Sequence, residues 1–276
     1  MKISNNLVDF MNCERLDTDL YRGQSKDLKT GQVYGGQVLG QAIKAAQHSV
    51  DEDRHVHSAH AYFLLKGDVN APIIYEVDRS LDGGSFSSRR VVAKQHGRQI
   101  LVLSASFQKR EDGLDFYTPI KPPVDALENA IKEDRLSVNS YQADYLDIYY
   151  LPDEEVSKSE SFQFWVKSKT PIPDNTADHN SVLAYISDVG LLHSTLKPHS
   201  LHAQVPSEQR KKLIMASIDH AIWFHRPFRA DEWFFVDCVA QSTGNGRGFS
   251  RGNLYTREGV LFASTSQEGL LRIKRE

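Results

Sequence analysis

The order of predicted elements occurs twice along this chain, and this repetition constrains the fold more than any other feature. Each half contains one segment whose apolar residues recur at helical spacing, at 34–47 and at 181–193. Each helix precedes four segments with the composition of short strands: 56–65, 72–80, 85–95 and 99–108, then 211–225, 232–240, 247–257 and 260–269. Short turns favour antiparallel neighbours, so each sheet must curl around its helix to bury it. The pattern predicts an α+β fold.

Short identical motifs support an internal duplication. Three of them recur in the same order: His60-Ala61 with His220-Ala221 and Ser104-x-Ser106 with Ser264-x-Ser266 at a separation of 160, and Phe86-Ser87 with Phe249-Ser250 at 163. We therefore predict two repeats, at 1–110 and 158–276. The second repeat begins with a strand at 162–168, and a polar, proline-containing connector over 111–157 joins the two.

The predicted helix at 181–193 carries an acid among apolar residues. Asp188 lies one turn from Ala184 and from Leu192, in a segment apolar enough to be buried. A buried carboxylate without hydrogen-bond donors costs several kcal/mol, so Asp188 needs partners from elsewhere in the fold. The plain alternative is a partly exposed aspartate near a helix end.

Composition excludes several classes of protein. The 276 residues contain 33 basic and 36 acidic side chains, a balance too even to indicate binding to nucleic acid or to a membrane surface. Cys13 and Cys238 form no C-x-x-C pair and are expected to be reduced thiols, with no metal site. The first residues have no apolar signal core, no apolar run is long enough to span a bilayer, and the last residues are no peroxisomal address, so we expect a cytoplasmic protein.

Several segments resemble those of the acyl-CoA thioesterase II family. They cover both halves in order: YRGQSKDL (21–28), YGGQVLGQA (34–42), HSAHAYFLLKGD (57–68), SIDHAIWFHRPF (217–228), GNGRGFSRG (244–252) and FASTSQEG (262–269). The resemblance implies a double hotdog fold, two repeats each with a long central helix wrapped by a curled antiparallel sheet. It also implies hydrolysis of acyl-CoA thioesters and a homo-oligomer, a dimer or a tetramer.

The family's catalytic trio falls on three residues of the second half. The resemblance places its aspartate on Asp188, its glutamine on Gln267 and its hydroxyl residue on Ser217, where threonine is commoner. Chemically, a carboxylate can take a proton from water while an amide and a hydroxyl hold the water oxygen against the thioester carbon. Serine keeps the hydroxyl but loses the methyl group that stiffens threonine, so we expect looser geometry.

Candidate substrate contacts lie outside this trio. Gly35 and Gly36 begin the first helix and leave backbone N–H groups open to a ligand oxygen, although a glycine pair there is more often simple helix punctuation. Four arginines near matching turns are candidates for the CoA phosphates, against the plainer reading of solvated strand residues: Arg89, Arg90, Arg247 and Arg251. No metal or redox cofactor is implied.

Two other patterns are expected to be structural. Ser250 lies in a G-x-S-x-G match, but a nucleophile elbow leads from a strand into a helix, and here a strand, a turn and a strand follow. His57, His60, His220 and His225 lack a recognised zinc spacing and are expected to be core or tunnel-wall residues.

Two rival functions remain open on sequence alone. A hotdog hydratase acting on enoyl-CoA would need an acid–base pair on one side of the substrate, and the one Asp-x-x-x-x-His spacing on the two predicted helices runs from Asp188 to His193. A non-catalytic acyl-CoA-binding protein would keep the pocket without turnover. Asp188 and Gln267 argue against it, since an uncompensated carboxylate facing an acyl chain weakens binding.

Overall fold

A single antiparallel sheet organises the molecule. The computed structural model describes residues 6–136, 142–152, 154, 161–201 and 213–274. The strands lie in the order β1-β2-β4-β5-β6-β3-β10-β13-β12-β11-β8-β7, with β9 paired to β13 beside this path. Their bounds are β1 Glu14–Asp17, β2 Leu20–Gly23, β3 Arg54–Phe63, β4 Ile73–Asp82, β5 Phe86–Gln95, β6 Arg98–Lys109, β7 Leu146–Tyr150, β8 Ser161–Ser168, β9 Leu213–Ser217, β10 Asp219–Phe224, β11 Phe234–Gly244, β12 Arg247–Tyr255 and β13 Leu261–Ile273.

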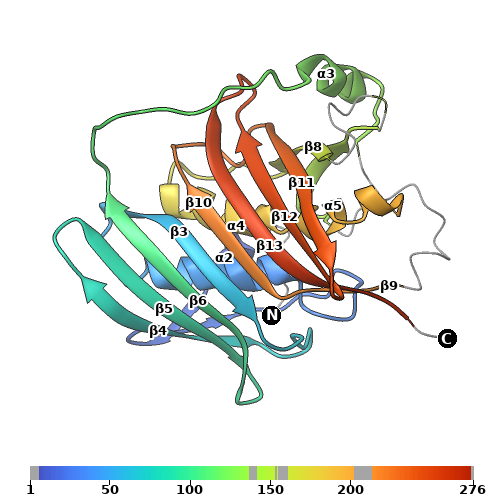
Figure 1. Ribbon diagram of the computed structural model, residues 1–276. Coiled ribbons are helices and arrows are strands. Elements are labelled where there is room, and N and C mark those ends of the chain that lie inside the picture. The colour runs from blue at the N-terminus through green and yellow to red at the C-terminus, as the bar shows by residue number, and fades with distance from the viewer. Residues whose placement is uncertain (1–5, 137–141, 153, 155–160, 202–212, 275–276) are drawn as a thin grey trace.

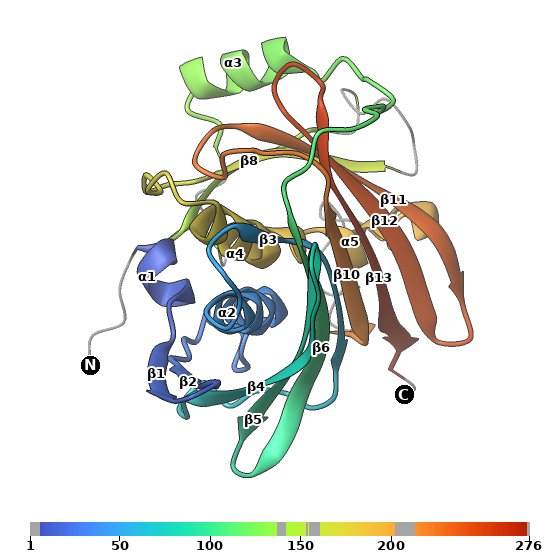
Figure 2. The ribbon, with the colours of Figure 1, turned by 90° about the vertical axis from the view of Figure 1, so that its left-hand side faces the viewer.

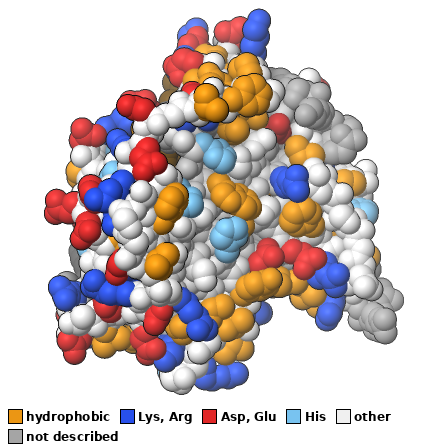
Figure 3. Space-filling view, turned by 60° about the vertical axis from the view of Figure 1, so that its left-hand side comes forward, with side chains coloured by type: hydrophobic (Ala, Val, Ile, Leu, Met, Phe, Trp, Pro, Cys, Tyr) orange, Lys and Arg blue, Asp and Glu red, His pale blue; other side chains and the backbone are white. Residues whose placement is uncertain are grey.

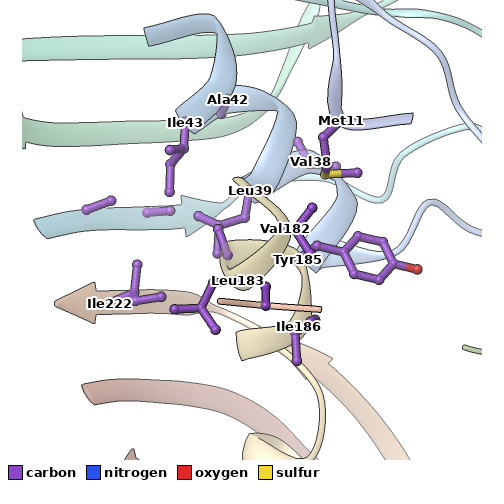
Figure 4. Packing of buried hydrophobic residues seen from close by; sticks show 14 of the residues in the cluster. Met11, Val38, Leu39, Ala42, Ile43, Val182, Leu183, Tyr185, Ile186 and Ile222 are labelled. Carbon is purple, nitrogen blue, oxygen red and sulfur yellow. The ribbon is translucent and has the colours of Figure 1, made fainter. Parts of the chain in front are cut away.

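Two helices fill the concave side of this sheet. Figure 2 shows the strands of the first half curling around α2, with α4 beside it. Their apolar faces meet in one core, which contains Val38 and Leu39 of α2 and Val182 and Leu183 of α4 (Figure 4). The described helices are α1 Leu7–Met11, α2 Gly35–Gln47, α3 Val124–Lys132, α4 Thr176–Ser187 and α5 Leu191–Ser194, with a 3₁₀ turn η2 at Lys197–His199.

Small residues let the backbones of α2 and α4 approach closely. A Cβ atom built at Gly40 would lie 2.7 Å from the carbonyl oxygen of Ser181, and one at Gly36 would overlap that of Tyr185. Glycine costs up to about 1 kcal/mol within a helix, so its use here reflects the contact. The Lys44 Nζ atom lies 2.5 Å from Asp178 Oδ1 and adds a buried ion pair between the two helices.

The two halves of the sheet join along one seam. β3 and β10 pair antiparallel, with Tyr62 opposite Asp219 and Ala61 opposite His220, so the sheet runs unbroken from one half into the other (Figure 1). The predicted first helix and the four strands of the first half are confirmed, as is the strand at 162–168. No described helix has the length and apolar character needed to cross a membrane.

The helix predicted over 181–193 is wrong at both ends. α4 begins at Thr176 and ends at Ser187, Asp188 caps its C-terminus, and Gly190 at a φ of 85° starts the short helix α5. The apolar pattern of the sequence continues past the end of α4 because Val189, Leu191 and Leu192 are buried as well. Positive φ favours glycine, which explains why the chain turns at Gly190.

Other sequence predictions also needed changes. The strand predicted at 211–225 is two strands, β9 and β10, separated at Ile218; its first two residues lie outside the described part. The residues before the first predicted helix contain α1, β1 and β2, for which no element was predicted. The expected connector contributes α3 and the edge strand β7, although 137–141, 153 and 155–157 are not among the described residues.

One of the three motif matches is not structurally equivalent. His60 is exposed on the outer face of β3, whereas His220 is buried and points toward the helices. A one-residue difference in strand register turns a side chain to the other face, so His60-Ala61 and His220-Ala221 do not correspond. Ser104 instead pairs with His60, while its counterpart Ser264 pairs with Trp223.

Candidate active site

The aspartate, glutamine and serine singled out in the sequence meet at one point. The Gln267 Nε2 atom donates to Asp188 Oδ1 at 2.6 Å and to the Ser217 Oγ atom at 3.0 Å. An ionised carboxylate only accepts hydrogen bonds, which fixes the orientation of the amide. The Gln267 Oε1 atom is consequently turned away from Asp188, and it is buried with no hydrogen-bond partner among the described residues.

Four elements place these side chains. Asp188 caps the end of α4, Ser217 ends β9, and Gln267 lies on the inward face of β13. The fourth element is α2, whose first residues approach Asp188 from the other half of the chain. The backbone N–H of Gly36 donates to the Asp188 carboxylate.

Opposing effects set the proton affinity of Asp188. Burial raises its pKa from 3.8 to about 6, and the hydrogen bonds from Gln267 and Gly36 partly counteract this rise. Its position at the C-terminus of α4 is unfavourable for a negative charge, whereas the N-terminus of α2 is favourable. A carboxylate with a pKa near 6 is ionised at neutral pH and is a stronger base than an exposed aspartate.

Gly35 and Gly36 contact the aspartate, although sequence reasoning expected them to face substrate. A Cβ atom built at Gly35 would lie 2.8 Å from Asp188 Oδ2 and 3.1 Å from the Phe63 ring. Any larger residue would push the carboxylate away. The Gly36 N–H is occupied by Asp188, so of the two only the Gly35 N–H is left as a candidate donor to a substrate oxygen.

His220 belongs to this site and was set aside in the sequence as a core residue. It is 1% exposed, and its Nδ1 atom lies 4.0 Å from Asp188 Oδ1. Burial lowers its pKa to about 3, so the imidazole is neutral. The expectation of a buried histidine is right, but its proximity to Asp188 depends on the β3–β10 and β10–β13 pairings, which no local pattern indicates.

The arginines fall into two groups, and neither joins the cluster of Asp188, Ser217 and Gln267. Arg89 is 2% exposed, and all five of its N–H groups are used within the first half, by Ser49, Leu81, Asp82 and Ser88. It therefore stabilises the fold and has no donor left for a phosphate. The other three lie at exposed positions that alternate with inward-facing ones, on the face opposite Gln267: Arg90, Arg247 and Arg251.

Ser250 is structural, as expected from the sequence. It is fully buried on β12, and its Oγ atom donates to the Leu191 carbonyl at 2.8 Å. A β-strand continues on both sides of it, so it stands on no nucleophile elbow.

Of the four histidines singled out in the sequence, the three other than His220 lie on the outer side of the molecule. His57 contacts Ser106, His225 contacts Ser264, and the His60 ring packs edge-on against Trp223. Figure 3 shows histidine and hydrophobic side chains in the middle of a face whose charged groups lie mostly toward its margin. Within the described residues no group of His, Cys, Asp or Glu is arranged to hold a metal ion.

Comparisons with known proteins agree with this geometry. A family model described as acyl-CoA thioesterase matches residues 154–270, and one described as acyl-CoA thioesterase N-terminal domain matches residues 25–108. The chain is 38% identical to acyl-coenzyme A thioesterase 8 of Mus musculus, with 97% of this chain and 89% of the mouse protein aligned.

Solved structures give the same result. The acyl-CoA thioesterase II TesB2 of Mycobacterium marinum matches with a TM-score of 0.81 and 35% identity over 97% of each chain. A protein with a hot dog fold from Alicyclobacillus acidocaldarius has a TM-score of 0.75 at 15% identity, covers 98% of this chain and 99% of its own, and shares the fold alone. The architecture is thus of the hotdog type, a fold that also serves thioester hydrolases. More narrowly, this chain belongs to the acyl-CoA thioesterase II family.

Proposed function

We propose that this chain hydrolyses acyl-CoA thioesters with a water molecule activated by Asp188, Ser217 and Gln267. The observation that carries the proposal is the Gln267 amide, which bonds both the Asp188 carboxylate and the Ser217 hydroxyl. A base, an amide and a hydroxyl within reach of one point suit direct attack of water on a carbonyl, without a covalent intermediate.

Each group has a distinct part in the reaction. Water lies against the Ser217 hydroxyl, beside the Gln267 amide that orients Asp188, and Asp188 takes one of its protons as the water oxygen bonds to the thioester carbon. The Gly35 N–H, at the N-terminus of α2, stabilises the negative charge that develops on the carbonyl oxygen. Collapse of this intermediate breaks the carbon–sulfur bond and releases the CoA thiolate, which is protonated by Asp188.

We also propose the finer organisation implied by the resemblance. The segments 1–110 and 158–276 form the two hotdog repeats, with 111–157 as a connector whose strand β7 pairs with the second repeat. A homo-oligomer, a dimer or a tetramer, and a cytoplasmic location complete the proposal. Cys13 and Cys238 are unpaired thiols, as is usual in a reducing compartment.

Product analysis separates the proposed activity from its rivals. Release of free CoA thiol and of fatty acid from palmitoyl-CoA is expected, and in H₂¹⁸O a single turnover should place one ¹⁸O atom in the acid. Formation of 3-hydroxyacyl-CoA from an enoyl-CoA would instead identify a hydratase. Binding of palmitoyl-CoA without any product would identify a sensor. Repeating the assay with C4 to C18 acyl-CoAs would define the preferred chain length.

The pH dependence of hydrolysis should report the ionisation of Asp188. Because the pKa of this base is about 6, kcat/KM is expected to be constant near pH 8 and to fall about tenfold per pH unit below pH 6. A profile that stays flat down to pH 5 would contradict a base with this proton affinity. Initial rates of thiol release between pH 4.5 and 8.5 provide the measurement.

Substitutions of Ser217 should show what its hydroxyl contributes. Ser217→Ala removes the acceptor of the Gln267 bond, and we expect kcat to fall about 10–100-fold. Ser217→Thr keeps the hydroxyl and adds a methyl group that restricts its rotamers, so its rate should stay within about threefold of the wild type. If Ser217→Ala were as active as Ser217→Thr, the hydroxyl would have no role in holding water.

A further inference from the structure

The hydrogen bonds of His220 fix where its single proton lies. The Ser187 hydroxyl donates its only hydrogen to the Ala184 carbonyl at 2.9 Å. It can therefore only accept from the His220 Nε2 atom, which lies 2.9 Å from Ser187 Oγ. The neutral imidazole consequently carries its hydrogen on Nε2 and presents a bare lone pair at Nδ1.

This lone pair faces the catalytic aspartate. The His220 Nδ1 atom is buried without a hydrogen-bond partner among the described residues, and Asp188 Oδ1 lies 4.0 Å away. Two acceptors with no hydrogen between them repel, which accounts for a separation greater than a hydrogen bond. A proton on Asp188 would supply the missing hydrogen and turn this contact into an attraction.

No other charge described around the pair competes with this effect. Asp219 and Glu268 flank the site in sequence, but they occupy strand positions that alternate with the inward-facing His220 and Gln267. Asp219 Oδ1 accepts instead from the backbone N–H of Glu268. The start of α2 contributes backbone N–H groups, Ala61 of β3 lies opposite His220, and the Phe63 ring lies beside Gly35.

We propose that His220 is the positioning residue of the catalytic base, accepting at Nδ1 the hydrogen that Asp188 acquires from water. In the resting enzyme the ionised carboxylate is held by Gln267 and Gly36. When the attacking water breaks an O–H bond and bonds to the thioester carbon, its proton passes to Asp188. The new O–H group then donates to His220 Nδ1 until the proton is transferred to the departing thiolate. Ser187 acts on Asp188 indirectly, through His220, because its bond to Nε2 keeps Nδ1 free of hydrogen.

This inference rests on the proposed hydrolysis and makes a separate prediction. His220→Gln places an amide near the Nε2 position and removes the acceptor that faces Asp188. The protonated carboxyl loses its partner, so the acid limb of the kcat/KM profile should move down by about one pH unit and kcat at pH 8 should fall about tenfold, with KM little changed. Ser187→Ala should move the limb in the same direction, because the imidazole is then free to carry hydrogen on Nδ1 and to donate to the carboxylate.

The matched control is His60→Gln, the same change on the exposed outer face of β3. The acid limb of its kcat/KM profile and its kcat should equal those of the wild type. The proposal is overturned if His220→Gln and Ser187→Ala lose rate or melting temperature while their acid limbs stay at the wild-type position, since that pattern reports a purely structural role. If His220→Gln fails to fold, the position of the acid limb in the kcat/KM profile of Ser187→Ala tests the proposal alone. Absence of thiol release by the wild-type protein would contradict the hydrolysis itself.

Discussion

Asp188→Asn is expected to reduce kcat for thiol release by about 10³-fold while leaving a folded protein. The asparagine amide matches the carboxyl group in size but cannot take a proton from water. The Gln267 bond to the side-chain oxygen at position 188 can persist, so substrate binding should change little. Initial rates with palmitoyl-CoA, together with the circular dichroism spectrum, provide the measurement.

The same variant should be more stable than the wild type at high pH. Because the pKa of Asp188 is raised in the folded state, its contribution to stability is fully present below about pH 4 and is lost as the pH rises through 6. A shift of about two pH units corresponds to about 3 kcal/mol at pH 8, part of which the neutral asparagine recovers. Urea unfolding at pH 5 and pH 8 tests this, and an equal difference between the proteins at both pH values would contradict it.

Asp237→Asn is a matched control for this experiment. Asp237 also accepts from a glutamine amide, the Gln163 Nε2 atom at 3.0 Å, but it lies on β11 away from the catalytic trio. Its rate of thiol release should follow the wild type. Loss of activity in both variants would show that the assay reports general damage and not loss of the base.

Gly36→Ala is expected to destabilise the protein and to inactivate it together. Alanine is favoured over glycine within a helix by about 0.5–1 kcal/mol, but its Cβ atom would overlap the Tyr185 carbonyl oxygen. A backbone atom cannot rotate aside, so α2 and α4 must separate at a cost of about 1–3 kcal/mol. Separation also withdraws the Gly36 N–H from Asp188. A lower melting temperature and a kcat reduced at least about tenfold should appear together.

Gly84→Ala makes the same chemical change where no atom lies within 4 Å of the added methyl group. We expect a melting temperature equal to or slightly above that of the wild type, because alanine restricts the unfolded chain. The close approach of the two helices would be disproved if Gly36→Ala were as stable as this control.

Sequence patterns predicted most of the sheet because alternation and turns are local signals. Strands β3 to β6 lie within two residues of their predicted bounds. The end of α4 was not predictable from hydrophobicity, since the apolar residues before and after Asp188 are buried alike. Gly190, which turns the chain, was the local signal that could have placed it.

Some residues of the candidate site were likewise predictable from the sequence, and others were not. The resemblance indicated Asp188, Ser217 and Gln267, and the geometry brings them together. The Arg89 pattern suggested an available cation, but its two bonds to Ser49 depend on how β5 packs over α2. His220 gave no usable signal, because the tautomer that makes it relevant depends on Ser187 in α4.

The proposed catalytic base and one of its backbone donors come from opposite halves of the chain. Asp188, Ser217 and Gln267 belong to the second half, whereas the Gly36 N–H belongs to the first. Loss of that hydrogen bond alone would raise the pKa of Asp188 further and leave less of the carboxylate ionised at neutral pH. Turnover is thereby tied to the packing of α2 against α4, because the first half of the chain supplies a donor that the proposed base in the second half needs.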